Sequence, residues 1–432
     1  MNLIRNIKNI LLKENYHLTS NNINLRDFHP QLYIFLAAIG IFTNNRNSLL
    51  RFIWPFVCIS ITLISLVLQG ISVVHGVIVK DYAVATECFF YFLVLGIILA
   101  VYGGILSNRE KIFQLLDDMN NDFHLTHLME SKYRDHFLKG QLIIRKLCYA
   151  WYIYTSIIAV MDFLLMMGTV LVQSLASTPD SHTNRPLMFP IWLPEDDPYR
   201  TPNYEIFAFI ETCYLAVVIQ SFCGYISVLL HILLHYYYVL DIIIKDFDVI
   251  FDGLDETVTY LPLQHPLRMQ AQYTLNSRMK RIVKRHNLVF KSVKTVSSVF
   301  GPPLVYQVLF SAIALCLLAY QVADKLEKGQ INVIFIMLFV GCCIQLWIPC
   351  YMGTLIRDKG FAVGDACWNS GWHKSRLGIL IRSDMVLVMQ RSQRPVTIKF
   401  IGLPQLQLET FSSIMTTAYS YFNMLRQYNS DS

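Results

Sequence analysis

The sequence predicts an all-α polytopic membrane protein with seven transmembrane helices, a cytosolic N-terminus, an extracellular C-terminus and a helical anchor layer in the cytosol. Composition is the first observation behind this fold class. Of 432 residues, 54% are hydrophobic and 15% are charged, and the mean hydropathy is +0.42. Average soluble domains carry about 25% charged residues. The other two observations are the apolar stretches along the chain and the placement of the basic residues between them.

A membrane-spanning helix needs about 20 mostly apolar residues. Seven stretches meet this requirement: 52–79, 83–106, 147–175, 206–234, 296–319, 331–351 and 406–427. The last is the least apolar, because it contains several serines and threonines together with Asn423. Lipid offers such side chains no partners, so we expect this helix to face protein or water.

Lysine and arginine set the expected orientation, because they concentrate on the cytosolic side of membrane proteins. The segments before the first span, between spans two and three, between four and five, and between six and seven carry 30 of the 36 Lys and Arg residues. This bias places the N-terminus in the cytosol, and seven spans then place the C-terminus outside. A G-protein-coupled receptor would run the other way.

The segments expected in the cytosol contain helices of their own. Residues 276–294 form a predicted basic helix, with Arg278, Arg281 and Arg285 at helical spacing, and residues 112–119 form a short amphipathic stretch. We expect a packed helical layer beneath the membrane; the alternative is helices that lie on anionic lipid. Gly301-Pro302-Pro303 breaks the backbone ladder near the fifth span and forms either a fixed kink or a hinge.

Residues that suggest metal, disulfide or charge chemistry are few. Nine of the ten cysteines fall in or beside apolar segments without zinc spacing, so we interpret them as packing residues and expect no disulfide framework, metal or other cofactor. His231 and His235 have a zinc-compatible spacing but no third partner, so we interpret them as a satisfied or solvated pair. Among the intramembrane acids, Asp162 binds either a ligand hydroxyl or a neighbouring helix, whereas Glu87 and Glu211 lie near the outer ends and reach water.

The end of the chain carries the most specific pattern. Leu408-Glu409-Thr410-Phe411, followed by the ten residues from Thr417 to Arg426, resembles the closing helix of insect odorant receptors. Gln393-Arg394-Pro395-Val396 and Gly402-Leu403 resemble the segment before that helix. The Thr-Tyr…Gln-Phe pattern that ends gustatory receptors is absent. The span count, the orientation and the chain length agree with the odorant receptors.

This resemblance implies an odorant- or pheromone-binding subunit of a tetrameric, ligand-gated, non-selective cation channel used in olfaction. It implies partnership with a shared co-receptor subunit in a hetero-tetramer, and a plasma-membrane location in the dendrite of an olfactory sensory neuron. The chain resembles a tuned subunit, because the co-receptor has a longer second cytosolic loop. The expected partners are a small hydrophobic volatile ligand and membrane lipid, not nucleic acid.

The last helix divides into two faces. Residues at spacings of four, three, four and three share one face, which is mostly small and polar: Ser413, Thr417, Ser420, Met424 and Gln427. Phe411, Ile414, Ala418, Tyr421 and Leu425 form the other, apolar face. The first face suits a water-filled pore; alternatively, its hydroxyls bond neighbouring helices. The resemblance implies a gate at Met424, Gln427 and Tyr428.

The resemblance also implies a ligand pocket in the outer half of the bundle, formed by the second, third, fourth and sixth spans with help from the fifth. Aromatic and methionine side chains adapt to varied apolar shapes. The candidates of this kind, with one threonine, are Phe89, Tyr91, Phe92, Met161, Met166, Phe209, Thr212, Tyr214 and Phe335. Each of them could instead pack against protein or face lipid.

We therefore expect four parts: a cytosolic N-terminal segment (1–51), six transmembrane helices with extended cytosolic loops (52–351), a cytosolic anchor segment (352–404), and a pore-lining seventh helix with a short extracellular tail (405–432). The alternative function is a metabotropic chemoreceptor of the G-protein-coupled type, which predicts the opposite orientation. An enzyme is not expected, because the sequence shows no nucleophile–base or metal constellation.

Overall fold

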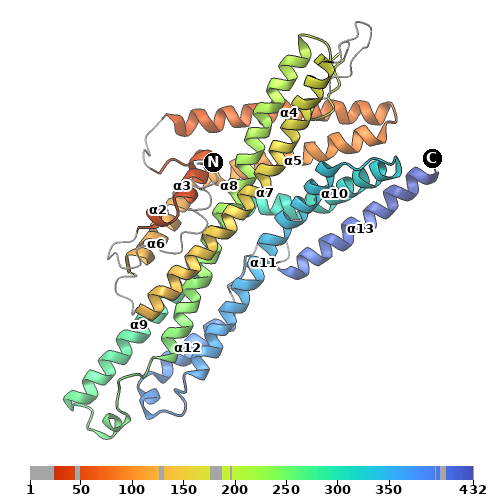
Figure 1. The fold of residues 1–432 in the computed structure, drawn as a ribbon. Helices are drawn as coiled ribbons and strands as arrows, with labels where there is room; N and C mark the ends of the chain where they lie inside the picture. The colour runs from red at the N-terminus through yellow and green to blue at the C-terminus, as the bar shows by residue number, and fades with distance from the viewer. Residues whose placement is uncertain are drawn as a thin grey trace.

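The computed structural model describes residues 24–43, 49–125, 131–175, 187–194, 197–394, 396–398 and 405–431. Within helices, the side chains of residues 131–132, 162, 165–166, 169–175 and 428–431 lie outside this description. The regular elements of the described residues are helices, and the longest of them form a bundle that is drawn out along one axis (Figure 1). The all-α fold predicted from composition is confirmed.

In the part of the chain that the structure describes, six helices are long and apolar enough to cross a membrane. They are α4 (Leu50–Ile78), α5 (Tyr82–Ser107), α7 (Ser131–Leu175), α8 (Asn203–Asp248), α10 (Gly301–Glu327) and α11 (Val333–Asn369). The seventh predicted span coincides with α13 (Leu408–Asp431), which is richer in hydroxyl side chains and lies beside α10 (Figure 1). Together these helices make the chain a multi-pass membrane protein.

Helix α4 has the polarity that a lipid environment requires. Its buried side chains are mostly small or polar, and include Thr62, Gln69 and Ser72. Its exposed side chains are apolar; Phe56 is 71% exposed and Ile78 is 73% exposed. In water this arrangement would be reversed, because burial of apolar surface drives folding. The face that points away from the bundle is therefore a lipid-facing surface.

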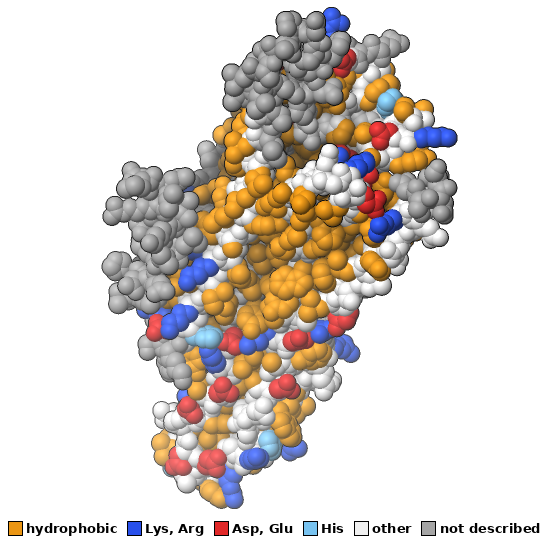
Figure 2. Space-filling view, turned by 45° about the vertical axis from the view of Figure 1, so that its right-hand side comes forward, with side chains coloured by type: hydrophobic (Ala, Val, Ile, Leu, Met, Phe, Trp, Pro, Cys, Tyr) orange, Lys and Arg blue, Asp and Glu red, His pale blue; other side chains and the backbone are white. Residues whose placement is uncertain are grey.

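The face of the molecule seen in Figure 2 repeats this pattern. Figure 2 shows hydrophobic side chains gathered in a broad band, with charged side chains concentrated toward the two ends of the molecule. A bilayer presents a hydrocarbon core between two polar interfaces. The band is the part of the surface that fits that core.

The remaining helices gather around one end of the bundle. They are α2 (Leu25–Phe28), α3 (Pro30–Ala38), α6 (Arg109–Leu125), α9 (Pro266–Val299) and α12 (Arg382–Ser392), with the 3-10 turns η2 (Glu256–Tyr260) and η3 (Arg376–Ile381). With the extended ends of α7, α8 and α11 they form a packed region that we call the anchor layer (Figure 1). The predicted short helices at 112–119 and 276–294 are parts of α6 and α9.

Ion pairs hold the anchor layer together. Asp241 on α8 pairs with Lys359 on α11 (2.5 Å) and with His136 on α7. On α9, Arg285 donates to Asp246 of α8 (3.1 Å), and Arg278 donates to the carbonyl of Ile250 just after α8 (2.6 Å). All three arginines predicted on the basic helix thus contact protein, since Arg281 also pairs with Asp246 (3.9 Å). These contacts favour a packed layer rather than a helix that lies on lipid.

A buried polar chain connects four parts of the anchor layer. Gln141 on α7 lies 3.0 Å from Nε2 of His29 and donates to Nδ1 of His235 on α8 (3.2 Å). His235 Nε2 donates to Asp122 on α6 (3.0 Å). His231, one turn before His235, contacts the Ser227 carbonyl at 2.7 Å. Both members of the predicted histidine pair are therefore satisfied and buried rather than solvated.

Two further expectations concern cysteine and proline. All ten cysteines lie in the described part of the chain and all are unpaired. The fifth span starts at Gly301 rather than at residue 296, so that predicted boundary was wrong. Pro302 and Pro303 stand in the first turn of α10, where a missing N–H costs no helical hydrogen bond. They separate α9 from α10 instead of kinking one continuous helix.

Burial of His286 on α9 predicts acid sensitivity. Burial and the nearby Arg391 lower the pKa of His286 from 6.5 to about 4. Burial also lowers the pKa of His29. The unfolded chain therefore binds protons that the folded chain does not, so stability falls as the pH drops from 6.5 toward 4. We expect His286→Gln to reduce this slope by about 1.4 kcal/mol per pH unit, measured by unfolding of the detergent-solubilised protein.

The matched control is His373→Gln, because His373 is exposed on the surface of the anchor layer. It should leave the pH dependence as in the wild type. Equal slopes for the wild type and His286→Gln would contradict the assignment of His286 as a buried, neutral histidine.

Candidate functional site

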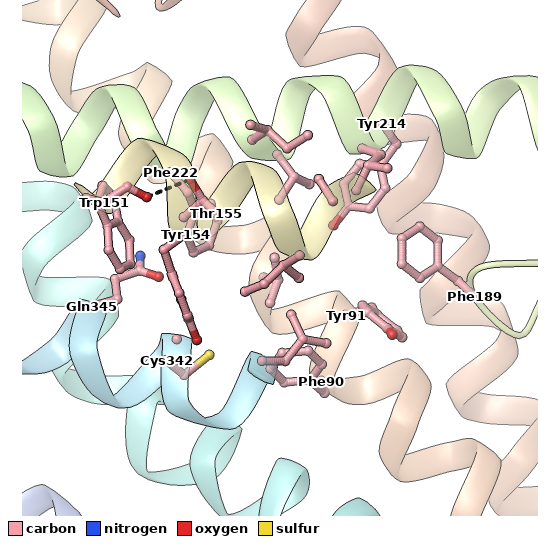
Figure 3. Close-up of a pocket in the computed structure, with 18 residues that line it drawn as sticks. Phe90, Tyr91, Trp151, Tyr154, Thr155, Phe189, Tyr214, Phe222, Cys342 and Gln345 are labelled. Carbon is pink, nitrogen blue, oxygen red and sulfur yellow. Dashed lines mark hydrogen bonds between the residues drawn. The ribbon is translucent and has the colours of Figure 1, made fainter. Parts of the chain in front are cut away.

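An apolar cavity lies inside the bundle, among α5, α7, α8 and α11 (Figure 3). Its volume is about 120 Å³. An engineered apolar cavity of about 150 Å³ in another protein binds benzene, so this one has the size for a small organic molecule. The lining residues are Phe90, Tyr91, Val94, Trp151, Tyr154, Thr155, Ile158, Ala159, Phe189, Tyr214, Leu215, Val218, Ile219, Phe222, Leu338, Gly341, Cys342 and Gln345.

Aromatic rings close one end of the cavity. The Phe189 ring lies edge-on to Tyr91 of α5 at 4.3 Å between centroids and to Tyr214 of α8 at 5.1 Å. Figure 3 shows these three rings together, with Trp151, Tyr154 and Gln345 at the opposite end. Edge-to-face packing of this kind stabilises ring clusters beyond their buried area. The ring cluster gives the cavity an apolar cap.

The opposite end carries the polar groups. Tyr154 donates to the Met337 carbonyl (2.7 Å), and Thr155 donates to the Trp151 carbonyl one turn earlier (3.0 Å). The indole N–H of Trp151 is buried and finds no acceptor among the described residues. An unsatisfied buried donor costs about 1–3 kcal/mol. A ligand with an acceptor oxygen near Trp151 would remove this cost.

Glu211 on α8 holds the segment that carries Phe189. Its carboxyl group accepts from the backbone N–H groups of Met188 (2.8 Å) and Phe189 (3.2 Å). Glu211 is 2% exposed, so the expectation that it reaches water was wrong; the loop before α8 covers it instead. Glu87 is partly exposed, and the side chain of Asp162 lies outside the described residues. Glu211 therefore positions the aromatic cap.

The structure places two of the nine candidate ligand residues, Tyr91 and Tyr214, in the cavity lining. The others lie elsewhere because successive residues of a helix point about 100° apart. Phe89 and Phe335 pack into a cluster between α5, α10 and α11, and Phe92 borders a groove beside α4. The remaining described candidates are Phe209, which is 70% exposed, Thr212, which donates to its own helix at Ala208, and Met161, near the start of α11. The Met166 side chain lies outside the description.

Sequence reasoning missed the deeper contributions from α7 and α11. On α7 the lining residues start ten positions before Met161, at Trp151, and recur at Thr155 and Ile158. Spacings of four and three place these residues on one helix face, and one of them is a threonine inside an apolar span. This pattern could have been recognised in the sequence. On α11, Gln345 is a polar residue in an apolar run and lies at the same end of the cavity.

Helix α13 separates into the two faces that its sequence suggests. Ile414 and Ala418 are buried against Leu315 of α10 and Leu346 of α11. On the other side, Ser413, Ser420, Met424 and Gln427 are exposed, and Thr417 is partly exposed. Tyr421, expected on the apolar face, is 43% exposed. The Tyr428 side chain lies outside the described residues.

The hydroxyl groups of α13 bond within their own helix. Thr417 donates to the Ser413 carbonyl (2.9 Å), and Ser420 donates to the Thr416 carbonyl (3.0 Å). A hydroxyl bonded to its own helix needs no partner on a neighbouring helix. The polar face of α13 is therefore compatible with water.

Both ends of α13 are attached to the bundle. At its start, Arg357 of α11 donates to Gln407 (2.7 Å), and the Leu408 N–H donates to Thr354 of α11 (3.0 Å). Gly353 allows this approach, because a Cβ there would overlap the Leu406 carbonyl. At its far end, Arg426 pairs with Glu327 of α10 (2.8 Å). Helix α13 is thus held by α10 and α11.

This fold and cavity define a polytopic helical membrane protein with an internal, ring-capped apolar cavity. The family model of the 7tm odorant receptors matches residues 104–419. The chain therefore belongs to the insect odorant receptor family.

Relatives in insects agree with this assignment. The chain is similar to odorant receptor 49a of Drosophila melanogaster, with 27% identity over 146 residues (34% of this chain, 36% of the relative). It is also similar to odorant receptor Or2 of Anopheles gambiae, with 26% identity over 154 residues (36% of this chain, 40% of the relative). The matched segment thus spans less than half the length of these relatives.

A solved structure supports the fold along nearly the whole chain. The insect olfactory receptor OR5 of Machilis hrabei, in complex with eugenol, superimposes with a TM-score of 0.74 and 16% identity. The match covers 94% of this chain and 98% of that one. At this level of identity the likeness establishes the shared fold.

The contact between Glu211 and the Phe189 segment generates a prediction. Glu211→Ala leaves two buried N–H groups without acceptors, which costs about 1–3 kcal/mol for each. The aromatic cap should loosen, and half-maximal activation should require about tenfold more odorant, as measured by dose–response in cells. Glu211→Gln, which keeps one acceptor oxygen, should give a smaller shift.

Glu205→Ala is the control, because Glu205 is exposed near the start of the same helix. Surface expression of each variant is measured in parallel. An unchanged dose–response for Glu211→Ala at normal expression would show that Glu211 does not position the cap.

Proposed function

We propose that this protein is an odorant- or pheromone-binding subunit of a tetrameric, ligand-gated, non-selective cation channel. The observation that carries the proposal is the exposed polar face of α13 in a bundle whose other long helices expose apolar side chains. Hydrocarbon gives such a face no partners, whereas a water-filled pathway does. One such helix from each of several subunits would enclose a pore.

The proposed gate lies toward the far end of this face. Met424 is 67% exposed and is the apolar member of the polar stripe. Rings of apolar side chains can close a pore by excluding water. Ser413, Thr417 and Ser420 would line the wider part of the pathway, and Gln427 and Tyr428 would follow Met424 outward.

The proposed ligand is a small, mainly apolar, volatile molecule held in the internal cavity. The ring cap at Tyr91, Phe189 and Tyr214 suits an apolar body, and the free indole N–H of Trp151, unpaired among the described residues, suits one acceptor oxygen. Most ligand pockets are apolar with a few placed polar groups. Binding would open the channel to the extent that the open state binds the odorant more tightly than the closed state does.

The proposed cellular location, orientation and partner are those that membership of the odorant receptor family implies. The chain would sit in the plasma membrane of an olfactory neuron dendrite, with its N-terminus in the cytosol and its C-terminus outside. A co-receptor subunit would complete the hetero-tetramer. In this arrangement residues 1–51 and 352–404 belong to the cytosolic anchor, residues 52–351 form the ligand-binding bundle, and residues 405–432 form the pore helix with its extracellular tail.

The test is a current measurement with G-protein signalling blocked. Cells express this chain with the co-receptor, and an odorant panel is applied. We expect odorant-evoked cation currents that persist under the block, because the channel lies within the receptor complex. Cells with either subunit alone are the matched controls.

Orientation is tested in the same cells. An epitope tag at the C-terminus should stain without permeabilisation. Currents that vanish under the block, together with a tag that stains only after permeabilisation, would favour the metabotropic alternative and overturn the proposal.

A further inference from the structure

A second chamber adjoins the odorant cavity on its α10 side. Its volume is about 60 Å³, half that of the first. We call the first cavity the outer chamber and the second the inner chamber. The partition between them consists of side chains that line both: Phe90, Val94, Phe222, Cys342 and Gln345. Movement of these five residues could join the two chambers, so that one molecule occupies both.

The inner chamber contains a polar group without a partner. Ser311 on α10 lines the chamber, and its hydroxyl oxygen is buried and has no hydrogen-bond partner among the described residues. Serine in a helix usually bonds the carbonyl four residues earlier, as other hydroxyls of this protein do. A hydroxyl can both donate and accept. An alcohol or carbonyl oxygen in the chamber would satisfy it.

Two neighbouring polar side chains are already engaged. Gln307 donates to the Gln345 carbonyl (2.8 Å), and Tyr306 donates to the Leu93 carbonyl (3.1 Å). The rest of the lining is largely aliphatic and aromatic. The inner chamber therefore suits the oxygen-bearing end of a molecule whose body is apolar.

The inner chamber also touches the residues that support α13. Leu315 and Leu346 line the chamber, and the same two side chains pack against Ile414 and Ala418 of α13. Both leucines are 1% exposed. Neither of them lines the outer chamber. An occupant of the inner chamber thus lies one side chain away from α13.

We propose that the inner chamber is a second ligand subsite, which takes the hydroxyl or carbonyl end of an elongated ligand whose apolar body fills the outer chamber. Its occupancy displaces Leu315 and Leu346 and so acts on α13. The outer chamber then determines which molecules bind, and the inner chamber determines how strongly they activate. This inference rests on the proposed ligand-gated function.

The probes are primary n-alkanols of increasing length and their methyl ethers. Binding is measured by thermal shift of the purified full chain, and activation by current in cells with the co-receptor. Ser311→Ala should weaken the longer alkanols about tenfold and remove their advantage over the ethers. Ala314→Leu fills the inner chamber. In this variant, affinity and maximal current should no longer increase with the length of the alkanol, while short alkanols should bind as before.

Two controls match these variants. Ser297→Ala removes a hydroxyl on α9, outside both chambers, and Ala319→Leu adds the same volume on α10, also outside both. Both should behave as the wild type. The inference is overturned if the wild type binds none of the alkanols, or if Ser311→Ala and Ala314→Leu leave binding and current unchanged. If Ser311→Ala and Ala314→Leu change alkanol binding as expected but even the wild type gives no current, the result would support the subsite and contradict the channel.

Discussion

The structure depends on one constraint: every polar group within the bilayer must find its partner inside the protein. Helix α4 shows the result, since the buried Thr62 and Ser72 donate to carbonyls of their own helix, while Phe56 and Ile78 face outward. Apolar surface costs nothing in hydrocarbon, so the bundle gains specificity from its internal polar contacts and from packing. The anchor layer applies the same logic in water, where Asp241 and Asp246 join three helices to α8.

Against this background, our proposals for function rest on the exceptions. A buried N–H at Trp151 and a buried hydroxyl at Ser311 lack partners among the described residues, and both line cavities. The exposed face of α13 is polar where its neighbours expose apolar side chains. Other buried polar atoms of the described residues also lack partners, but those of Trp151 and Ser311 belong to cavity-lining residues, where a ligand or water can complete the structure.

The sequence predicted the helices well and the cavity poorly. Apolar length was enough to find the six long apolar helices α4, α5, α7, α8, α10 and α11, and the residue spacing on α13 predicted its buried Ile414 and Ala418. The cavity forms only where five segments pack together, and residue type alone does not show which side chains meet there. Phe92 and Phe209 were therefore as good candidates for ligand contact as Tyr91, which does line the cavity. Likewise, Glu211 looked solvated near a helix end, because the sequence does not show that the Phe189 segment folds over it.

The most direct test of this account asks which face of α13 meets water. Ser420→Cys and Ile414→Cys are compared by modification with a charged, membrane-impermeant thiol reagent in cells that also express the co-receptor. We expect rapid modification of Ser420→Cys, faster with odorant and accompanied by a change in current, and no modification of Ile414→Cys. Equal reactivity, or a reactive Ile414→Cys beside an inert Ser420→Cys, would contradict a pore lined by the exposed face of α13.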